Sequence, residues 1–226
     1  MSSPTTIELK NIDSEDISDV LRKVEKSFGF QFGDTELQDV KTFGELCDII
    51  TSKVQGDNSD DCTTQQAFYK LRDAIAATLC IDKGSLTVDT KLQELFPRRQ
   101  RRRQIKAVER LLGFKTKVLR PKHWLTTTLA LILIASLVGL FISWQAGLAG
   151  LVFSFAALSI SNKLGNEFDV TTVGQLAEKI TRENYRQVRR NPTTVNQKEV
   201  AKKVKELFMT DLDLKEELLT RQATFV

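Results

Sequence analysis

The sequence predicts an all-α protein that includes a two-helix transmembrane hairpin. Three observations lead to this fold class. One long segment lacks charged residues, apolar residues elsewhere recur every three or four positions, and residues that break helices are scarce. The chain of 226 residues contains only 4 prolines and 11 glycines. Because strand-like alternation is also scarce, we expect helices in nearly all of the regular structure.

The charge-free segment occupies 122–163, and no Asp, Glu, Lys or Arg stands between the lysines at its two ends. Its first half, Trp124–Trp144, has about the ~20 residues that a helix needs to cross roughly 30 Å of hydrocarbon. The second half, Ala146–Ile160, is shorter and richer in glycine and alanine, which let helices approach closely. We therefore predict a membrane hairpin with its turn at Trp144–Gln145. The alternative is a pair of buried helices in a soluble protein.

Both ends of such a hairpin face the same compartment. Arg120, Lys122 and Lys163 flank the segment, and an excess of Lys and Arg near the membrane ends marks the cytoplasmic side. The N-terminal MSSPTTIELKNIDSED lacks the apolar run of a signal peptide. These features predict a two-pass integral membrane protein with both termini in the cytoplasm.

The rest of the chain shows helical periodicity. Apolar residues recur at intervals of three and four, as on a helix with one buried face. Glycines and a polar run, QGDNSDD over 55–61, separate the periodic stretches. The expected helices are Ile17–Phe28, Ala67–Leu79, Ile105–Leu112, Val173–Ile180 and Val200–Phe208.

An internal repeat organises these helices. LRKVEKSFGF matches IKAVERLLGF, which places Gly29 on Gly113, and TFGELCDIIT matches TVGQLAEKIT. The C-terminal stretch 204–225 matches 71–92. The offsets of the first two pairs are 84 and 130, so the second copy carries 46 additional residues between Gly113 and Thr172. That insertion is the predicted hairpin with its flanks.

Each copy combines a helix and a loop with a Leu-Thr pair, a helix ending in Gly-Phe, and a short helix opening with Thr-x-Gly-x-Leu. In the second copy these parts read LRDAIAATLCIDKGSLTVDTKLQEL, IKAVERLLGF and TVGQLAEKI. This order resembles the acyl carrier protein family, whose small four-helix bundles hold a 4′-phosphopantetheine arm. The resemblance covers almost all of the chain outside the hairpin and implies two small acyl-carrier-like helical bundles.

The repeat and the resemblance together predict how the chain is divided. The first lobe is circularly permuted, because its opening helix stands near the C-terminus. Alternatively, this helix completes a lobe of a neighbouring molecule or forms an independent tail. The predicted parts are the first lobe, 10–54 with 196–226; a linker, 55–63; the second lobe, 64–121 with 164–183; the inserted hairpin, 122–163; and a linker, 184–195.

The resemblance implies one candidate cofactor site, Ser14. Family members carry the phosphopantetheine on a serine in an Asp-Ser-Leu turn at the start of the second helix. Asp13 and Ser14 stand at that position, with Glu15 in place of the leucine. In the second copy Pro97 and Arg98 occupy it, so that lobe has no attachment serine. The competing interpretation makes Ser14 a helix N-cap. We therefore expect either no cofactor or 4′-phosphopantetheine on Ser14.

A cluster of arginines follows Pro97, which we expect in the first turn of the helix that ends at Gly113. A cationic cluster near a membrane span favours anionic lipid headgroups or an acidic protein. The alternative is a solvated positive face. Nucleic acid is not expected, because the net charge is only +4 and no nucleic-acid-binding motif is recognised. The candidate anionic-surface-binding residues are Arg98, Arg99, Arg101, Arg102 and Arg103.

Sequence patterns of catalytic and metal sites are missing. The single histidine, His123, stands at the membrane boundary, and the three cysteines lack metal-ligand spacing and read as reduced cytoplasmic thiols. We therefore predict no catalytic residue and no metal. The favoured function is a noncatalytic, membrane-anchored scaffold or interaction protein that contacts the lipid bilayer and acyl-handling enzymes. The alternative is a membrane-tethered acyl carrier that uses Ser14.

Overall fold

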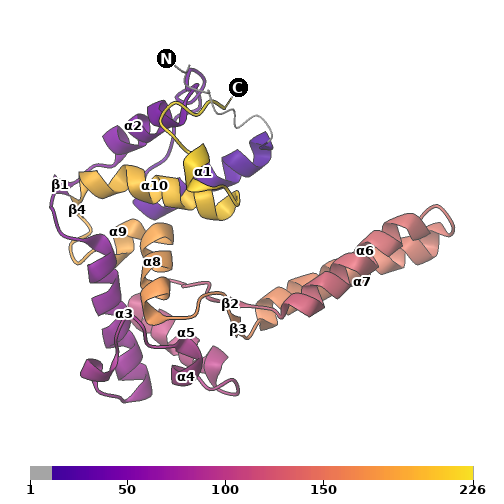
Figure 1. The fold of residues 1–226 in the computed structure, drawn as a ribbon. Helices are drawn as coiled ribbons and strands as arrows, with labels where there is room; N and C mark the ends of the chain where they lie inside the picture. Colours follow the sequence, from indigo (N-terminus) through magenta and orange to yellow (C-terminus); the bar gives the residue numbers. More distant parts are fainter. Residues whose placement is uncertain (1–11, 226) are drawn as a thin grey trace. The chain divides into compact units, whose positions relative to one another are not determined.

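The computed structural model describes residues 12–225, whose regular structure is mostly helical, as the sequence predicts (Figure 1). Residues 10, 11 and 226 of the predicted first lobe lie outside the described residues, as does most of the N-terminal stretch used to exclude a signal peptide. The α-helices are α1 (Ser14–Phe28), α2 (Phe43–Lys53), α3 (Thr63–Leu79), α4 (Leu92–Leu95), α5 (Arg101–Leu112), α6 (His123–Gly139), α7 (Trp144–Leu164), α8 (Val173–Glu183), α9 (Tyr185–Val188) and α10 (Gln197–Asp211).

Short elements complete the regular structure of these residues. The strands pair into two ladders, β1 with β4 in parallel and β2 with β3 antiparallel. The 3₁₀-helices are η1 (Lys83–Ser85) and η2 (Glu216–Leu218), and the strands are β1 (Asp57–Asn58), β2 (Leu119–Arg120), β3 (Glu167–Phe168) and β4 (Thr194–Val195).

The chain divides into two compact units. We call residues 12–71 with 177–225 the first unit and residues 72–176 the second unit. The division falls within α3 and α8, whereas the sequence places its boundaries in 55–63 and 184–195. In the structure both of those stretches belong to the first unit.

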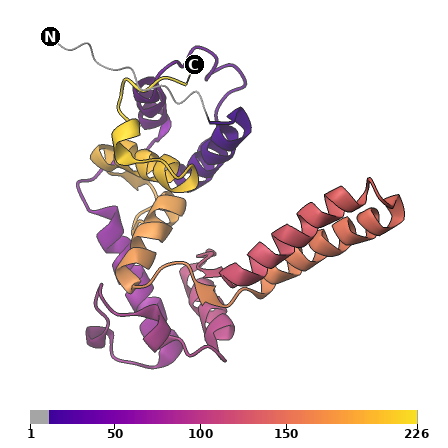
Figure 2. The ribbon, with the colours of Figure 1, turned by 45° about the vertical axis from the view of Figure 1, so that its right-hand side comes forward.

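The first unit has a core built from both ends of the chain. α10 packs against α1 and α2, and the views of Figures 1 and 2 agree on this. The rings of Phe43 and Phe208 lie edge to face with their centroids 5.3 Å apart. The helix residues that share this core include Val20, Val24, Phe28, Leu46, Ile50, Val200, Val204 and Leu207. Burial of this many large apolar side chains is the main stabilising term for the unit.

The C-terminal segment also forms backbone contacts with the start of α2. The N–H of Phe43 donates to the carbonyl of Ala223 at 2.8 Å, and the N–H of Phe225 donates to the carbonyl of Lys41 at 3.1 Å. Residues 219–225 are therefore attached to the first unit by hydrogen bonds as well as by apolar packing.

The stretch 184–195, predicted as a linker, contains α9 and β4 and contributes to the core. Tyr185 is buried against Phe28, with ring centroids 4.8 Å apart. Arg189 is completely buried, and its guanidinium donates to the hydroxyls of Thr63 at 2.6 Å and Thr194 at 3.1 Å. These long-range contacts give the stretch a fixed path that its polar composition does not indicate.

The second unit outside the hairpin is built from the end of α3, α4, α5 and the start of α8. The N–H of Val173 donates to the carbonyl of Thr90 at 3.0 Å, which connects the start of α8 to the loop after η1. The buried apolar residues are Ala74, Ile75, Ala76, Leu86, Leu92, Phe96, Ile105, Val108, Val118, Val173 and Leu176. Ile75, Ile105, Val108, Val173 and Leu176 lie at positions that the apolar periodicity predicts, whereas Leu86, Leu92, Phe96 and Val118 lie outside the expected helices.

Helices α6 and α7 form an antiparallel hairpin within the second unit (Figures 1 and 2). The backbones approach so closely that a Cβ atom added at Gly147 would lie 2.6 Å from the backbone nitrogen of Leu140. The turn covers 140–143, and Trp144 already begins α7, so the predicted turn at Trp144–Gln145 is corrected. The N–H of Ser143 donates to the carbonyl of Gly139 at 2.8 Å and the carbonyl of Ser143 accepts from Gly147 at 2.9 Å, so the turn closes before Trp144.

The two hairpin helices differ in length. α7 has 21 residues and is long and apolar enough to cross a membrane, whereas α6 has 17 residues and is apolar but shorter. At 1.5 Å per residue these helices span about 31 and 26 Å. Much of their apolar surface is exposed, and at the tip Phe141 and Ile142 are 93% and 86% exposed. The two-pass topology stays a prediction.

Candidate functional site

Ser14 is the first residue of α1, and its side chain is exposed. The carboxylate of Asp13 accepts a hydrogen bond from the N–H of Glu15 at 3.0 Å and caps the helix. An acidic residue suits this place, because it also lies at the positive end of the helix dipole. The interpretation of Ser14 as the N-cap is therefore wrong. Its hydroxyl has no capping role and is accessible to solvent.

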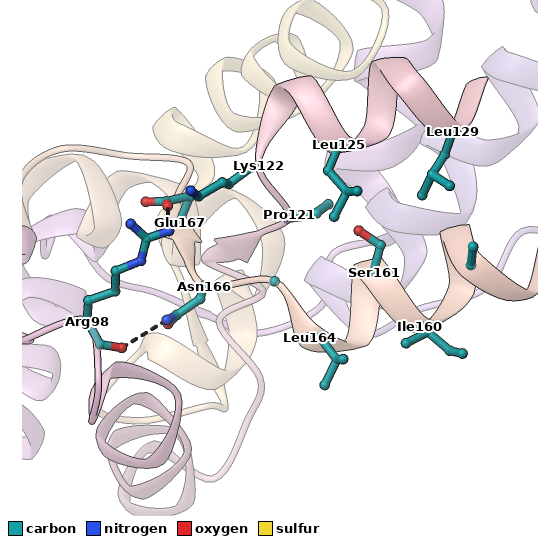
Figure 3. A pocket seen from close by; sticks show the side chains of 12 residues that line it. Arg98, Pro121, Lys122, Leu125, Leu129, Ile160, Ser161, Leu164, Asn166 and Glu167 are labelled. Carbon is teal, nitrogen blue, oxygen red and sulfur yellow. Dashed lines mark hydrogen bonds and ion pairs between the residues drawn. The ribbon is translucent and has the colours of Figure 1, made fainter. Parts of the chain in front are cut away.

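The equivalent position in the second copy is Arg98, which lies in a turn before α5. The N–H groups of Gln100 and Arg101 donate to the carbonyl of Pro97 at 3.0 and 2.9 Å, so Pro97 begins this turn rather than the helix. Arg98 pairs with Glu167 of β3 at 2.5 Å (Figure 3). A cation held by a carboxylate therefore stands where the other copy presents a hydroxyl.

The structure separates the five arginines of the cluster into different environments. Arg101 is only 5% exposed, and its guanidinium donates to the carbonyl of Asn166 at 2.6 Å and lies 4.5 Å from the ring centre of Phe168. Burial lowers the pKa of this guanidinium, and the nearby Glu167 acts in the opposite direction. Arginine nevertheless stays charged in proteins. Arg101 thus attaches α5 to β3 and does not present its charge to a surface.

The remaining arginines lie nearer to solvent. Arg99 and Arg103 are exposed, while Arg102 is half-buried and donates to the carbonyl of Lys163 at 2.9 Å. A shallow hollow on α5 is lined by Arg102, Arg103, Lys106 and Arg110, with Ala107 between them. Spacings of three and four residues place these cations on one helix face. The sequence prediction missed Lys106 and Arg110, although helical periodicity could have found them.

A pocket of about 440 Å³ opens where α6 begins and α7 ends, and we call it the root pocket (Figure 3). Its volume lies within the range of roughly 300–1,000 Å³ that is typical of small-molecule sites. The apolar lining residues are Pro121, Leu125, Leu129, Ala157, Ile160 and Leu164, and the polar ones are Arg98, Lys122, Ser161, Asn166 and Glu167. The sequence carried no signal for this pocket, because its two sides are about 40 residues apart.

Two polar atoms in the root pocket are buried without a hydrogen-bond partner among the described residues. They are the hydroxyl of Ser161 and the side-chain oxygen of Asn166. The amide nitrogen of Asn166 donates to the carbonyl of Arg98 at 2.9 Å, which fixes that side chain at the pocket wall. Buried polar groups are nearly always hydrogen-bonded. The pocket therefore offers a free hydroxyl and a free amide oxygen beside apolar walls.

The described residues hold no group of three or more His, Cys, Asp or Glu side chains that could bind a metal ion. The three cysteines are free thiols, and Cys47 is buried in the first unit. Burial raises the pKa of the Cys47 thiol to about 12, so it stays protonated at neutral pH. His123 lies at the start of α6, with its Nδ1 3.2 Å from the Thr127 hydroxyl. The predicted lack of a catalytic site stays a prediction.

Comparison with known proteins finds local similarity to an acyl carrier protein of Coprothermobacter proteolyticus. Over 44 residues the two sequences are 46% identical, which corresponds to 20% of this chain and 54% of the relative. The chain thus spans about half the length of that carrier protein. No family profile matches the chain, and no solved structure gives a significant match. The similarity supports an acyl-carrier-like region in a mostly helical chain.

Proposed function

We propose that this chain is a membrane-anchored, noncatalytic protein built from two acyl-carrier-like lobes. It holds a partner, such as an acyl-handling enzyme, at the cytoplasmic face of the membrane. The local similarity to a carrier protein supports a carrier-like region. The observation that carries the two-lobe proposal is the recurrence of the same backbone contacts at positions aligned by the repeat.

The first set of recurring contacts lies at the two Thr-x-Gly-x-Leu helices. In each unit the start of this helix forms backbone hydrogen bonds with an extended segment, which follows the opening helix and its loop. The bridge Thr42–Thr224 has its counterpart in Lys91–Thr172. The N–H of Phe43 donates to the carbonyl of Ala223, as the N–H of Val173 does to the carbonyl of Thr90. The N–H of Gly44 donates to the carbonyl of Arg221, as the N–H of Gly174 does to the carbonyl of Val88.

The second set lies after the helices that end in Gly-Phe. Gly29 and Gly113 both adopt positive φ, 71° and 81°, as left-handed C-terminal caps. In each copy the glutamate four residues before the glycine accepts a hydrogen bond from a backbone N–H three residues after the glycine. Glu25 accepts from Phe32, and Glu109 accepts from Thr116, both at 2.7 Å. A shared side-chain contact of this kind favours a common ancestry of the two lobes over chance similarity between helices.

These contacts support the division into a first lobe of 10–54 with 196–226 and a second lobe of 64–121 with 164–183. In this division 55–63 and 184–195 stand between the lobes in the sequence, although both belong to the first unit of the structure, and 122–163 is an insertion in the second lobe. α10 and its loop supply the opening helix of the first lobe from the C-terminus. Because α10 buries its apolar face in the same molecule, intramolecular completion is favoured over an exchange between molecules or a free tail.

The apolar hairpin supports the membrane anchor. α7 is long and apolar enough to cross a membrane, and exposed apolar surface of this extent needs a cover. The flanking cations Arg120, Lys122 and Lys163 favour a two-pass topology with both termini in the cytoplasm. The cationic face of α5 would contact anionic headgroups or an acidic protein, and nucleic acid is not expected as a partner.

Thiol labelling in intact cells tests this topology. A cysteine introduced at the hairpin tip, Ile142→Cys, should react with a membrane-impermeant maleimide from outside. The exposed native thiols of Cys62 and Cys80 provide matched cytoplasmic controls, which should react only after permeabilisation. Labelling of either native thiol in intact cells would contradict the topology. Protection of Ile142→Cys in intact cells would contradict the two-pass hairpin.

A second candidate function is a membrane-tethered acyl carrier with 4′-phosphopantetheine on Ser14. The exposed hydroxyl of Ser14 next to the capping Asp13 favours it, whereas Glu15 in place of the family's leucine does not. We expect no adduct in intact mass spectrometry after treatment with coenzyme A and a broad-specificity phosphopantetheinyl transferase. An adduct that is lost in Ser14→Ala, but kept in the neighbouring Ser18→Ala, would establish the carrier instead.

A further inference from the structure

We propose that the root pocket binds one anionic phospholipid, whose acyl chain lies along α6 and α7 and whose phosphate lies at Lys122. The proposal rests on the membrane anchoring proposed above and adds a specific ligand site to it. Three features of the pocket carry the proposal: its apolar walls, its unpartnered hydroxyl and its charges.

The walls of the pocket continue the membrane-facing surface of the hairpin inward. Leu125 and Leu129 of α6 point toward α7, and Ile160 of α7 lines the pocket beside them (Figure 3). Leu129 is the deepest of them and is buried, whereas the outer apolar residues of both helices are exposed. Because the apolar lining residues lie on the same two helices as that exposed apolar surface, a hydrocarbon chain on the hairpin can extend into the pocket.

Ser161 provides the polar contact. It is only 7% exposed, its hydroxyl has no hydrogen-bond partner among the described residues, and it projects from α7 toward the start of α6 (Figure 3). Two other serines of the hairpin bond to the carbonyl four residues earlier, Ser136 to Ile132 at 2.7 Å and Ser154 to Gly150 at 2.8 Å. A hydroxyl left unpaired at the border between apolar and polar walls is placed to donate to an ester oxygen of the lipid.

The charges at the polar end favour an anionic headgroup. Glu167 is held by Arg98 at 2.5 Å and lies 3.6 Å from the guanidinium of Arg101, so two cations already surround this carboxylate. Lys122 lines the same end of the pocket and is exposed. Its ammonium is therefore available to a phosphate. A zwitterionic headgroup carries the same phosphate beside a positive charge, so it gains less from this lysine than an anionic headgroup does.

Native mass spectrometry of the full-length protein, purified in detergent, tests the proposal. We would add phosphatidylglycerol or phosphatidylcholine with identical acyl chains and count the lipids retained per chain. The wild-type protein should retain one phosphatidylglycerol in preference to phosphatidylcholine. Ser161→Leu fills the pocket and should abolish this retention, while Ser161→Ala, which keeps the space, should weaken it. Should Ser161→Leu fail to fold, Ser161→Ala keeps the proposal testable.

Lys122→Gln isolates the headgroup contact. We expect it to reduce the preference for phosphatidylglycerol about fivefold, the size typical of one lysine near an anionic surface. Lys163→Gln removes the same charge near the same end of the hairpin, outside the lining of the root pocket. It should have a smaller effect. Equal effects of the two variants would show that Lys122 acts only through general surface charge, which would overturn the specific site.

Other outcomes would also overturn the proposal. Retention that is unchanged in Ser161→Leu would place the lipid elsewhere on the hairpin. Retention of added oleate without any phospholipid would make the occupant a free fatty acid. Liposome flotation tests the membrane anchor separately from the lipid site. If Ser161→Leu still floats with liposomes but the wild-type protein retains no lipid, the proposed lipid site is wrong and the membrane anchor stands. If the wild-type protein does not float, the anchor itself fails.

Discussion

The two units differ most at the start of the helix that ends in Gly-Phe. In the first unit Asp13 caps α1 and Ser14 is exposed. In the second unit the equivalent Arg98 pairs with Glu167, and α5 begins three residues later without a side-chain cap. The same position of a similar helix can thus carry an exposed hydroxyl or form an internal ion pair. Only the first unit presents a hydroxyl there.

The second difference is the insertion after that helix. The first unit connects α1 to α2 through residues 29–42, whereas the second contains β2, the hairpin and β3. β2 and β3 pair antiparallel, with Arg120 opposite Glu167, so the two ends of the insertion meet. A segment whose ends lie side by side can be inserted at a surface turn without opening the core. The fold thus accommodates the hairpin because of this short ladder.

The largest effects should come from the matched core residues Phe208 and Ile75, both fully buried. Phe208→Ala should destabilise the first unit by about 3–5 kcal/mol, and Ile75→Ala should destabilise the second by about 2–5 kcal/mol. Hydrogen exchange followed by mass spectrometry would locate each effect. We expect Phe208→Ala to expose the amides of α1, α2 and α10, with those of α5 still protected.

The half-exposed Leu218 provides a control, because Leu218→Ala removes less buried surface and should leave both units protected. Loss of protection in both units from either core variant would contradict independent lobes. Protection of residues 12–54 after truncation following Asn191 would show that the C-terminal helix does not complete the first lobe.

The two capping glycines should give an intermediate effect that differs between the units. Either Gly→Ala change forces a side chain into the left-handed region, at a cost of about 1–2 kcal/mol. A Cβ at Gly29 would also lie 2.9 Å from Cδ of Arg186, whereas one at Gly113 meets nothing within 4 Å. Moving Arg186 should add about 0.5–1.5 kcal/mol to Gly29→Ala. Denaturant unfolding would measure both, and equal costs would contradict this account.

The smallest effect is a pH dependence of the first unit. The carboxylate of Glu45 accepts the backbone N–H groups of Lys41 at 2.8 Å and Thr42 at 3.0 Å, and these bonds lower its pKa. Its counterpart Gln175 makes the equivalent contact with Thr171 at 2.7 Å and does not titrate. A hydrogen bond from Lys53 lowers the pKa of Glu36 in the same unit.

A carboxylate with a lowered folded pKa stabilises the fold above its unfolded pKa, about 4.3 for glutamate. This contribution falls as the pH drops through the lower folded value. Acid titration followed by hydrogen exchange should therefore show the first unit weakening below about pH 4.3 more than the second. Glu45→Gln should reduce this difference, and Glu36→Gln in addition should reduce it further. An unchanged acid profile in the double variant would assign the effect to other carboxylates.

Much of the fold could be predicted from the sequence, because its signals are local. The expected helices at Ile17–Phe28, Ala67–Leu79 and Ile105–Leu112 lie within α1, α3 and α5. One apolar face per helix is enough to indicate such an element, and a glycine marks the end of the first and the third. The connecting stretch 184–195 could not be predicted, because Tyr185 and Arg189 are placed by contacts with residues far away in the chain.

For the candidate sites too, some features could be predicted from the sequence and others depend on long-range contacts. The sequence by itself determined that one segment is free of charge, that cations flank it and that the cluster after Pro97 is basic. Only the tertiary structure decided which of these cations is buried, since Arg101 finds its partner Asn166 65 positions along the chain. The root pocket likewise exists only where the ends of α6 and α7 meet. Charge and hydropathy are properties of residues, whereas burial and partnership depend on which distant residues the fold brings together.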